Sequence, residues 1–289
     1  MLETIDQTIT DLNKHDYVLD RPLATAVFLA LKMKKPLFLE GESGVGKTEI
    51  AKVLSNVLAT PLIRLQCYEG LDVSSAAYEW DYAKQILEIK LLESRGELKG
   101  DDLKINLFSD KFLLKRPLLK SLEPQKTGER PVLLIDELDR ADEPFEAFLL
   151  ELLSEFQITI PEIGLVKASK PPIVIITSNR TREIHDAIKR RCIYHWVGYP
   201  EISQELNIVT RKVQDIDREF ARQIVDHVQR LRKKELFKTP GTAETIDWAI
   251  ALQNLGENQL SESNIKNTLG VLLKHKDDIL ESSADEKKS

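Results

Sequence analysis

The segment that most constrains the fold is a glycine-rich octapeptide, Gly-Glu-Ser-Gly-Val-Gly-Lys-Thr, at residues Gly41–Thr48. The apolar run 36–40 before it predicts a short buried strand, and residues 49–54 after it predict a helix. A strand, a glycine-rich turn and a helix in this order are typical of a phosphate-binding loop, in which the helix N-terminus faces the anion. The alternative is a chance glycine-rich turn, for which the loop, its Lys-Thr pair and both flanks would all have to coincide.

All eight residues of this loop are candidate ligands of a nucleoside triphosphate. Lys47 is predicted to reach the β- and γ-phosphates, and the hydroxyl of Thr48 is predicted to bind Mg²⁺. The other members are expected to present backbone amides to phosphate oxygens. They are Gly41, Glu42, Ser43, Gly44, Val45 and Gly46.

Composition narrows the class of protein. The 289 residues are 42% hydrophobic and 30% charged, as in an ordinary globular protein of one large or two modest domains. A formal net charge of -6 without a basic domain argues against nucleic-acid binding. Cys67 and Cys192 lack metal-ligand spacing and favour a reduced compartment. No stretch approaches the roughly 18 apolar residues of a membrane span, and no apolar signal core opens the chain, so we expect a cytoplasmic protein.

Strand and helix patterns alternate along the first two thirds of the chain. Strands are predicted at 61–66, 132–135, 172–176 and 192–197, helices at 21–35, 74–93 and 143–156 with a short one within 103–122, and a hairpin at 157–166. This order predicts a parallel αβα sheet covered on both faces. Beyond Pro200 only helical patterns continue. We therefore expect a nucleotide-binding α/β domain at 1–200, a small helical domain at 201–281 and a disordered tail at 282–289.

Two acidic residues, Asp136 and Glu137, follow the buried strand 132–135. A carboxylate at the end of a strand beside a phosphate loop is placed to hold Mg²⁺, directly or through water, which makes Asp136 the second candidate metal ligand. Glu137 is the candidate to orient or activate the attacking water. The alternative is a solvated acidic loop, and the phosphate loop upstream favours the catalytic interpretation.

Polar residues after the next strand are further candidates. Asn179 can hydrogen-bond the γ-phosphate or the attacking water, or it can simply cap the strand end. Arg190 or Arg191 can reach the γ-phosphate of a neighbouring subunit as an arginine finger. The alternative for these two residues is the charged last turn of a helix.

Several further segments are distinctive in sequence. Residues 64–72 read Arg-Leu-Gln-Cys-Tyr-Glu-Gly-Leu-Asp and residues 134–142 read Leu-Ile-Asp-Glu-Leu-Asp-Arg-Ala-Asp, and 78–80, 156–162, 177–183 and 189–192 belong to the same set. With the phosphate loop, these segments resemble the AAA+ ATPases, more narrowly the MoxR family, and within it the CoxD-like branch that serves carbon monoxide dehydrogenase. The resemblance runs from about Leu19 to Leu252.

The resemblance implies an AAA+ P-loop NTPase, with an αβα core followed by a helical lid, that binds ATP and Mg²⁺. It implies a homo-oligomeric ring, commonly a hexamer, in which Arg190 occupies the position of the family's finger and Arg191 can substitute. Members of the family act as chaperone-like machines that assemble or activate protein complexes and insert metal cofactors. Their typical partner carries a von Willebrand factor A domain.

These features lead to three functional hypotheses. The first is an ATP-hydrolysing machine that remodels or matures a protein complex such as a metalloenzyme. The second is a nucleotide-gated assembly scaffold with little hydrolysis, against which Glu137 argues. The third is a DNA-linked AAA+ ATPase, against which the acidic net charge argues.

The predicted lid departs from a common AAA+ pattern. Many AAA+ lids offer a second sensor arginine near the start of a lid helix. The comparable stretch here, 238–245, reads Lys-Thr-Pro-Gly-Thr-Ala-Glu-Thr and contains no arginine. Helix-capping chemistry explains this stretch better than a charge from Lys238 does. The lid residue that contacts the nucleotide therefore has no assignment from sequence.

Overall fold

The computed structural model describes residues 2–95, 107–123 and 130–285. The chain divides into two compact units. Unit 1 takes in Met1–Phe28, Glu40–Val53 and His195–Ser289, and unit 2 takes in Leu29–Leu39 and Leu54–Tyr194. The glycine-rich loop therefore falls in unit 1, and the acidic pair after residue 135 falls in unit 2.

A five-stranded parallel sheet forms the centre of the fold, as the sequence predicts. Its strand order is β2-β5-β8-β1-β9. In the two pairings of β5, Val132 lies opposite Leu62 of β2 and opposite Ile173 of β8, both in parallel. The same register places Gln66 beside Asp136. The strands are β1 (Leu37–Gly41), β2 (Leu62–Gln66), β5 (Val132–Asp136), β8 (Ile173–Ser178) and β9 (Ile193–Val197).

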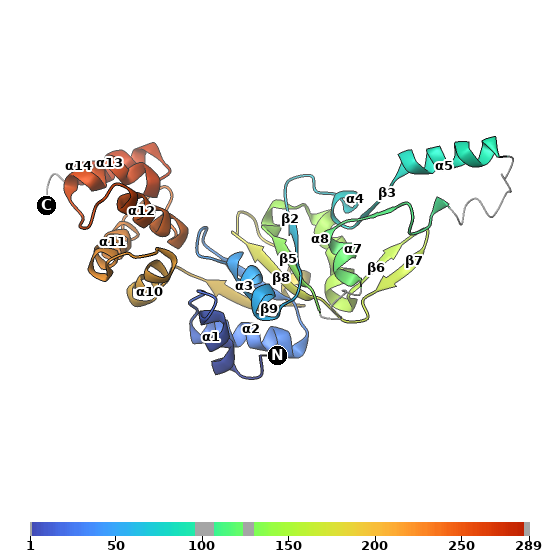
Figure 1. Cartoon of the computed structure of the whole chain (residues 1–289), viewed down its shortest axis with the longest axis horizontal. Helices are drawn as coiled ribbons and strands as arrows, with labels where there is room; N and C mark the ends of the chain where they lie inside the picture. The colour runs from blue at the N-terminus through green and yellow to red at the C-terminus, as the bar shows by residue number, and fades with distance from the viewer. Residues whose placement is uncertain (1, 96–106, 124–129, 286–289) are drawn as a thin grey trace. The chain divides into compact units, whose positions relative to one another are not determined.

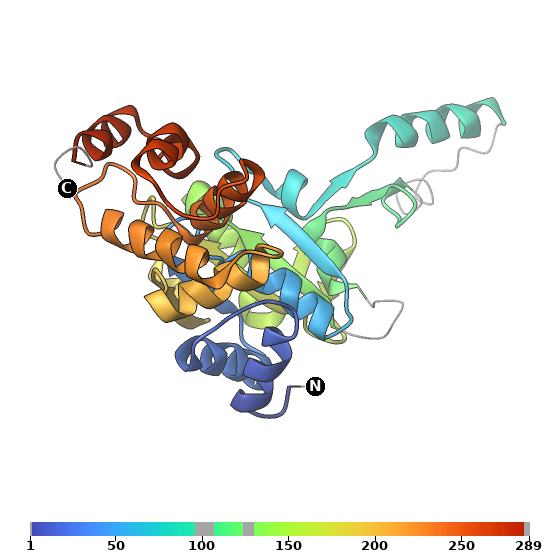
Figure 2. The same cartoon turned by 60° about the vertical axis from the view of Figure 1, so that its left-hand side comes forward.

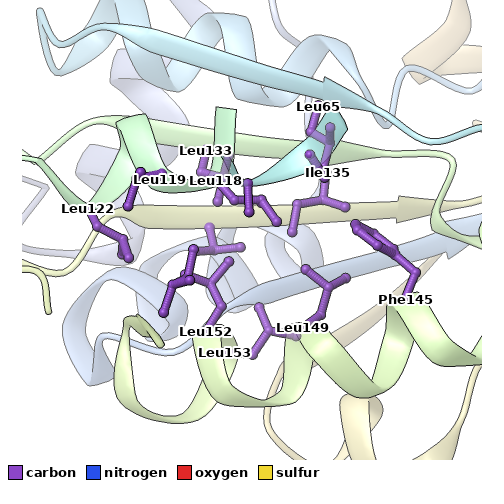
Figure 3. Close-up of a cluster of buried hydrophobic side chains, with 14 of the residues drawn as sticks. Leu65, Leu118, Leu119, Leu122, Leu133, Ile135, Phe145, Leu149, Leu152 and Leu153 are labelled. Carbon is purple, nitrogen blue, oxygen red and sulfur yellow. The ribbon is translucent and has the colours of Figure 1, made fainter. Parts of the chain in front are cut away.

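Helix packing in unit 2 buries the central strand. Every residue of β5 is buried, as expected for a parallel strand with helices on its faces. Helix α8 (Glu143–Glu155) begins where the carboxylate of Asp142 accepts a hydrogen bond from the amide of Phe145 at 3.0 Å. It ends at Phe156, whose φ of 51° is left-handed. The apolar face of α8 and helix α7 (Pro117–Leu122) pack against β5 (Figure 3).

An arm projects from the rest of unit 2, where the sequence predicts one helix over 74–93 (Figures 1 and 2). That prediction is wrong in its middle, because strand β3 (Tyr78–Trp80) separates α4 (Val73–Ala76) from α5 (Tyr82–Ser94). Strand β3 pairs in antiparallel fashion with β4 (Leu113–Lys115), and this long-range pairing overrides the helical pattern. Asp81 then starts α5 by accepting a hydrogen bond from the amide of Lys84 at 3.0 Å.

The remaining predictions for unit 2 agree with the structure. The hairpin predicted at 157–166 is formed by β6 (Gln157–Ile160) and β7 (Gly164–Lys167). Helix α7 is the short helix predicted within 103–122, and residues 103–106 of that range lie outside the described residues.

The C-terminal region is helical, as predicted (Figure 1). Trp248 is fully buried in its core, and the indole Nε1 donates a hydrogen bond to Thr268 Oγ1 at 2.7 Å. Its helices are α10 (Ile202–Lys212), α11 (Arg218–Leu231), α12 (Thr242–Asn254), α13 (Glu262–Leu272) and α14 (Lys276–Asp285), and the helices before the sheet and after the loop are α1 (Ile5–Asn13), α2 (Arg21–Met33) and α3 (Glu49–Val57).

The disordered tail predicted from residue 282 is wrong over its first four residues. Helix α14 continues to Asp285, and Ser282 is only 2% exposed. Ser282 is therefore packed against the protein, which the polar composition of this segment does not predict. Residues 286–289 of the predicted tail lie outside the described residues. Within the part of the chain that the structure describes, no helix combines the length and the apolar character that crossing a membrane requires.

The packing of α8 on β5 generates a stability prediction. Leu149 is fully buried, so Leu149→Ala should lower the free energy of unfolding by about 2–5 kcal/mol, because it removes apolar contacts and leaves a cavity. Leu87→Ala on the exposed arm is the control and should change it by less than about 0.5 kcal/mol. Urea unfolding followed by circular dichroism measures both, and equal losses would contradict the assigned core.

Candidate nucleotide site

The glycine-rich loop in unit 1 has the backbone that its composition predicts. Gly44 and Gly46 have φ angles of 73° and 93°, in the left-handed region that only glycine adopts without strain. The backbone amides of residues 43–46 donate no hydrogen bond to any described residue. A series of free amides at the start of a helix is the arrangement that binds phosphate. The loop therefore fits a bound triphosphate.

Lys47 is buried within this loop. The side-chain Nζ donates hydrogen bonds to the carbonyl oxygens of Gly41 at 2.8 Å and Glu42 at 2.5 Å. The residue is only 5% exposed, so its ammonium group is held by the loop itself. An ammonium that bonds neutral carbonyls can transfer to phosphate oxygens, which form stronger charge-assisted hydrogen bonds.

The other loop residues lie around this lysine. Glu42 and Ser43 are exposed, and Gly44, Val45, Gly46 and Thr48 are half-buried. The hydroxyl of Tyr17 donates to the carbonyl of Gly46 at 3.3 Å. Burial raises the pKa of Tyr17, and the carboxylate of Glu49 raises it further, so the hydroxyl stays protonated and remains a donor. Tyr17 is a loop contact that sequence reasoning missed, because it lies far upstream of the motif.

Asp136 ends β5 in unit 2 with its carboxylate fully engaged. Oδ1 accepts a hydrogen bond from Thr177 Oγ1 at 2.6 Å, and Oδ2 forms an ion pair with Arg64 Nη2 at 2.6 Å. Asp136 is 2% exposed, and a buried carboxylate needs such a cation beside it. The guanidinium of Arg64 therefore occupies a cation position on the predicted metal ligand. This arrangement fits Mg²⁺, which favours carboxylate and hydroxyl oxygens.

Glu137 adopts a left-handed backbone conformation, with φ of 55° and ψ of 52°. Its amide donates to Thr177 Oγ1 at 2.9 Å, and its carboxylate Oε2 accepts from Gln66 Nε2 at 3.1 Å. Such a conformation in a residue other than glycine costs about 1–3 kcal/mol and is concentrated at functional sites. Gln66 and Thr177 are the neighbours that orient this carboxylate. Sequence reasoning did not select them, because strand pairing alone brings them to Glu137.

The backbone after β8 is held by Asp139 of the short 3-10 turn η1 (Leu138–Arg140). The buried carboxylate of Asp139 accepts hydrogen bonds from the amide of Asn179 at 3.2 Å and from the amide of Thr181 at 2.9 Å. The side-chain amide of Asn179 donates to no described residue, so the structure gives no support to a strand-end cap. Its two donors and its acceptor are therefore available for a ligand.

The two candidate finger arginines differ in their surroundings after α9 (Asp186–Lys189). Arg191 is held within the chain, because Nε donates to Ser154 Oγ at 2.5 Å and Nη1 donates to the carbonyl of Ala187 at 2.8 Å. Arg190 is exposed, and its guanidinium contacts no hydrogen-bond or ion-pair partner in the described parts of the chain. Arg190 is thus the arginine that can reach another molecule.

Cys67 and His185 have structural surroundings. Burial raises the pKa of the Cys67 thiol to about 12, and the nearby carboxylate of Asp136 adds to the shift, so the thiol stays protonated. His185 caps α9, with Nδ1 accepting from the amide of Ala187 at 3.1 Å. No cluster of three or more His, Cys, Asp or Glu side chains suited to a metal occurs within 2–95, 107–123 and 130–285.

Comparison with known sequences gives a family for this region. Residues 36–192 match the family model described as an AAA domain of the dynein-related subfamily. Uncharacterized proteins from two Staphylococcus aureus strains are 26% and 25% identical over 174 residues, which are 58% of this chain. The chain spans 57% of the length of these relatives.

Comparison with solved structures supports the same fold. A mutant of RuvB from Thermotoga maritima has a TM-score of 0.50 and 17% sequence identity, over 93% of this chain and 72% of that chain. A second RuvB mutant gives the same TM-score and coverage at 18% identity. At such identities the likeness concerns the fold alone. The family match covers more than half of the chain, including the phosphate loop and the acidic pair, and the chain therefore belongs to the AAA+ ATPases with a dynein-related AAA domain.

Proposed function

We propose that this protein binds ATP with Mg²⁺ and hydrolyses it to remodel or mature another protein complex, in the manner of the MoxR family that its sequence resembles. The proposal rests on two sets of residues in this chain, each described within its own unit. The loop of unit 1 offers free amides and the ammonium of Lys47. The end of β5 in unit 2 offers Asp136 and Glu137, oriented by Thr177.

Magnesium binding falls to Thr48 and Asp136 in this proposal. When bound, Mg²⁺ neutralises charge on the phosphate oxygens. Mg²⁺ held by Asp136, directly or through water, would weaken the ion pair with Arg64, because two cations would then share one carboxylate. Arg64 is half-exposed, so the guanidinium can move into water once it is displaced.

Hydrolysis requires a group that holds the attacking water. Glu137 carries this role in the proposal because its carboxylate directly follows β5 and accepts a hydrogen bond from Gln66 Nε2 at 3.1 Å. The same Oε2 atom forms a longer ion pair with the exposed Arg140 Nη1 at 3.4 Å, and exposed pairs of this kind are weak. Asn179, with a free side-chain amide, would contact the γ-phosphate or the water. These roles favour turnover over a nucleotide-gated scaffold.

The partners follow from the family and from Arg190. AAA+ ATPases are typically oligomers, and a guanidinium without a partner among the residues that the structure describes suits a site on a neighbouring subunit. We propose a homo-oligomeric ring, such as a hexamer, in which Arg190 completes the adjacent ATP site. A partner with a von Willebrand factor A domain, a metalloenzyme client and a cytoplasmic location belong to the same proposal.

Lys47→Ala should weaken ATP binding by about 100-fold or more, because it removes the buried cation that pairs with the triphosphate. Lys52→Ala on α3, the helix that follows the loop, is the control, since Lys52 is exposed and pairs with Glu49. Isothermal titration calorimetry with ATP and Mg²⁺ measures both affinities. If Lys47→Ala binds ATP as tightly as the control does, the loop is not the nucleotide site.

Glu137→Gln should retain ATP affinity and lower the rate of phosphate release by about 10²–10⁴-fold, because the amide cannot accept a proton from water. Glu143→Gln is the control, since Glu143 is exposed on the neighbouring helix α8. Steady-state phosphate release and nucleotide binding are measured on the same preparations. Equal and negligible rates in wild type and variant would favour the scaffold instead.

Arg190→Ala should keep ATP binding and lower hydrolysis by about 10³-fold or more, because charge on the γ-phosphate loses its cation. Mixing tests whether this arginine acts between subunits. Lys47→Ala subunits keep Arg190 but lose their own site, so mixing them with Arg190→Ala subunits should restore phosphate release. Arg191→Ala, which breaks contacts within the chain, should lower thermal stability more than turnover. Mixtures that remain inactive would contradict a finger in trans.

A further inference from the structure

Two glycines, one in the phosphate loop and one at the start of α12, meet at very short range within unit 1. A Cβ atom added to Gly241 would lie 2.6 Å from the carbonyl oxygen of Ser43 and 2.9 Å from Cα of Gly44. A Cβ atom added to Gly44 would lie 2.6 Å from Glu244 Oε2 and 3.3 Å from Cα of Gly241. Distances this short leave no room for a side chain on either residue. We call this contact between Gly44 and Gly241 the glycine seam.

A backbone hydrogen bond crosses the glycine seam. The amide of Ala243, in the first turn of α12, donates to the carbonyl of Gly44 at 3.0 Å. In a planar trans peptide the carbonyl and the following amide point in opposite directions. The bond from Ala243 therefore directs the amide of Val45 away from α12. That amide is one of the free donors of the loop.

A buried ionic network fixes the turn that carries Gly241. The guanidinium of Arg232, the residue that follows α11, donates to both carboxylate oxygens of Glu205 on α10, each at 2.7 Å, and Nε donates to the carbonyl of Pro240 at 2.8 Å. Glu205 also accepts from Thr245 Oγ1 at 2.8 Å. Arg232 is 6% exposed and Glu205 fully buried. A buried bidentate pair with its remaining oxygens satisfied holds its neighbours in one geometry.

We infer that the start of α12 is the lid's contact with the phosphate loop, in the place where the sequence offers no sensor arginine. Ala243 orients the loop peptide whose amide receives phosphate, and Arg232 is the positioning residue that holds Pro240 and Gly241 against the loop. Triphosphate binding and the placement of α12 are thereby coupled through the glycine seam. The inference rests on the proposed ATP site.

Gly241→Ala tests the glycine seam, because its new methyl group cannot fit beside Ser43 and Gly44. Relief of these contacts requires the loop and the start of α12 to separate, which lengthens or breaks the bond from Ala243. We expect the affinity for ATP with Mg²⁺, measured by calorimetry, to fall about tenfold or more. The control is Gly270→Ala on α13, where an added Cβ meets nothing within 4 Å. Its affinity should match that of wild type.

Arg232→Lys is the second variant. It removes the guanidinium contacts to Pro240 and Glu205 and changes no atom of Gly44 or Gly241. Hydrogen exchange of the loop amides provides a readout that general destabilisation would not move selectively. We call Gly241→Ala and Arg232→Lys the seam variants. In both, the bound nucleotide should protect the amides of residues 43–46 from exchange less than it does in Gly270→Ala, while the amides of α3 remain protected. A Gly241→Ala protein that fails to fold leaves Arg232→Lys to decide.

The outcomes separate the inference from the proposed function. Wild-type protein that binds no ATP would refute the nucleotide site itself. If the wild type binds ATP and the seam variants show the same affinity and the same loop protection, the coupling is overturned and the ATP site stands. Reduced affinity and reduced protection in the seam variants alone would support it.

Discussion

The register of β5 between its two neighbours is the constraint that positions the candidate catalytic residues of unit 2. Pairing with β2 brings Gln66 beside Asp136, and pairing with β8 brings Ile176 beside Ile135, so that Thr177 follows at the same level as the acidic pair. A slip of one residue would turn every side chain of β5 to the opposite face. The leucine-rich packing of α7 and α8 against β5 prevents such a slip, because it buries one particular face (Figure 3).

The candidate residues of unit 1 and those of unit 2, each taken within its own unit, show a similar electrostatic arrangement. In each unit a cation is already bound to oxygen atoms of the protein: Lys47 to carbonyls of its own loop and Arg64 to the carboxylate of Asp136. Burial explains the first contact, since Lys47 is buried, and burial of the Asp136 carboxylate explains the second, since an isolated charge in a poorly solvated place is costly. Each buried charge is thus compensated within its own unit.

Much of the fold follows from local patterns. The apolar run of β5, the cap at Asp142 and the strand-loop-helix order around the glycines each occupy contiguous residues, and the structure has all of them. The secondary-structure predictions are wrong where contacts with distant segments override the local pattern. Strand β3 interrupts the predicted helix 74–93 because it pairs with β4, about thirty residues later. The last turn of α14 includes Ser282, which is buried although the local composition is polar.

Sequence motifs were enough to predict the candidate residues: a lysine and a hydroxyl in a glycine loop, a pair of carboxylates after a buried strand, and a basic turn. Such motifs can be recognised in a sequence because their residues are consecutive and have a characteristic spacing. The contacts that these candidate residues make could be known only from the folded structure. The bond from Tyr17 to the loop, the ion pair of Arg64 and the glycine seam with Gly241 join residues far apart in the chain. Side-chain geometry also left Arg190 free and tied Arg191 to its own chain, because only Arg191 lies within reach of Ser154 and Ala187.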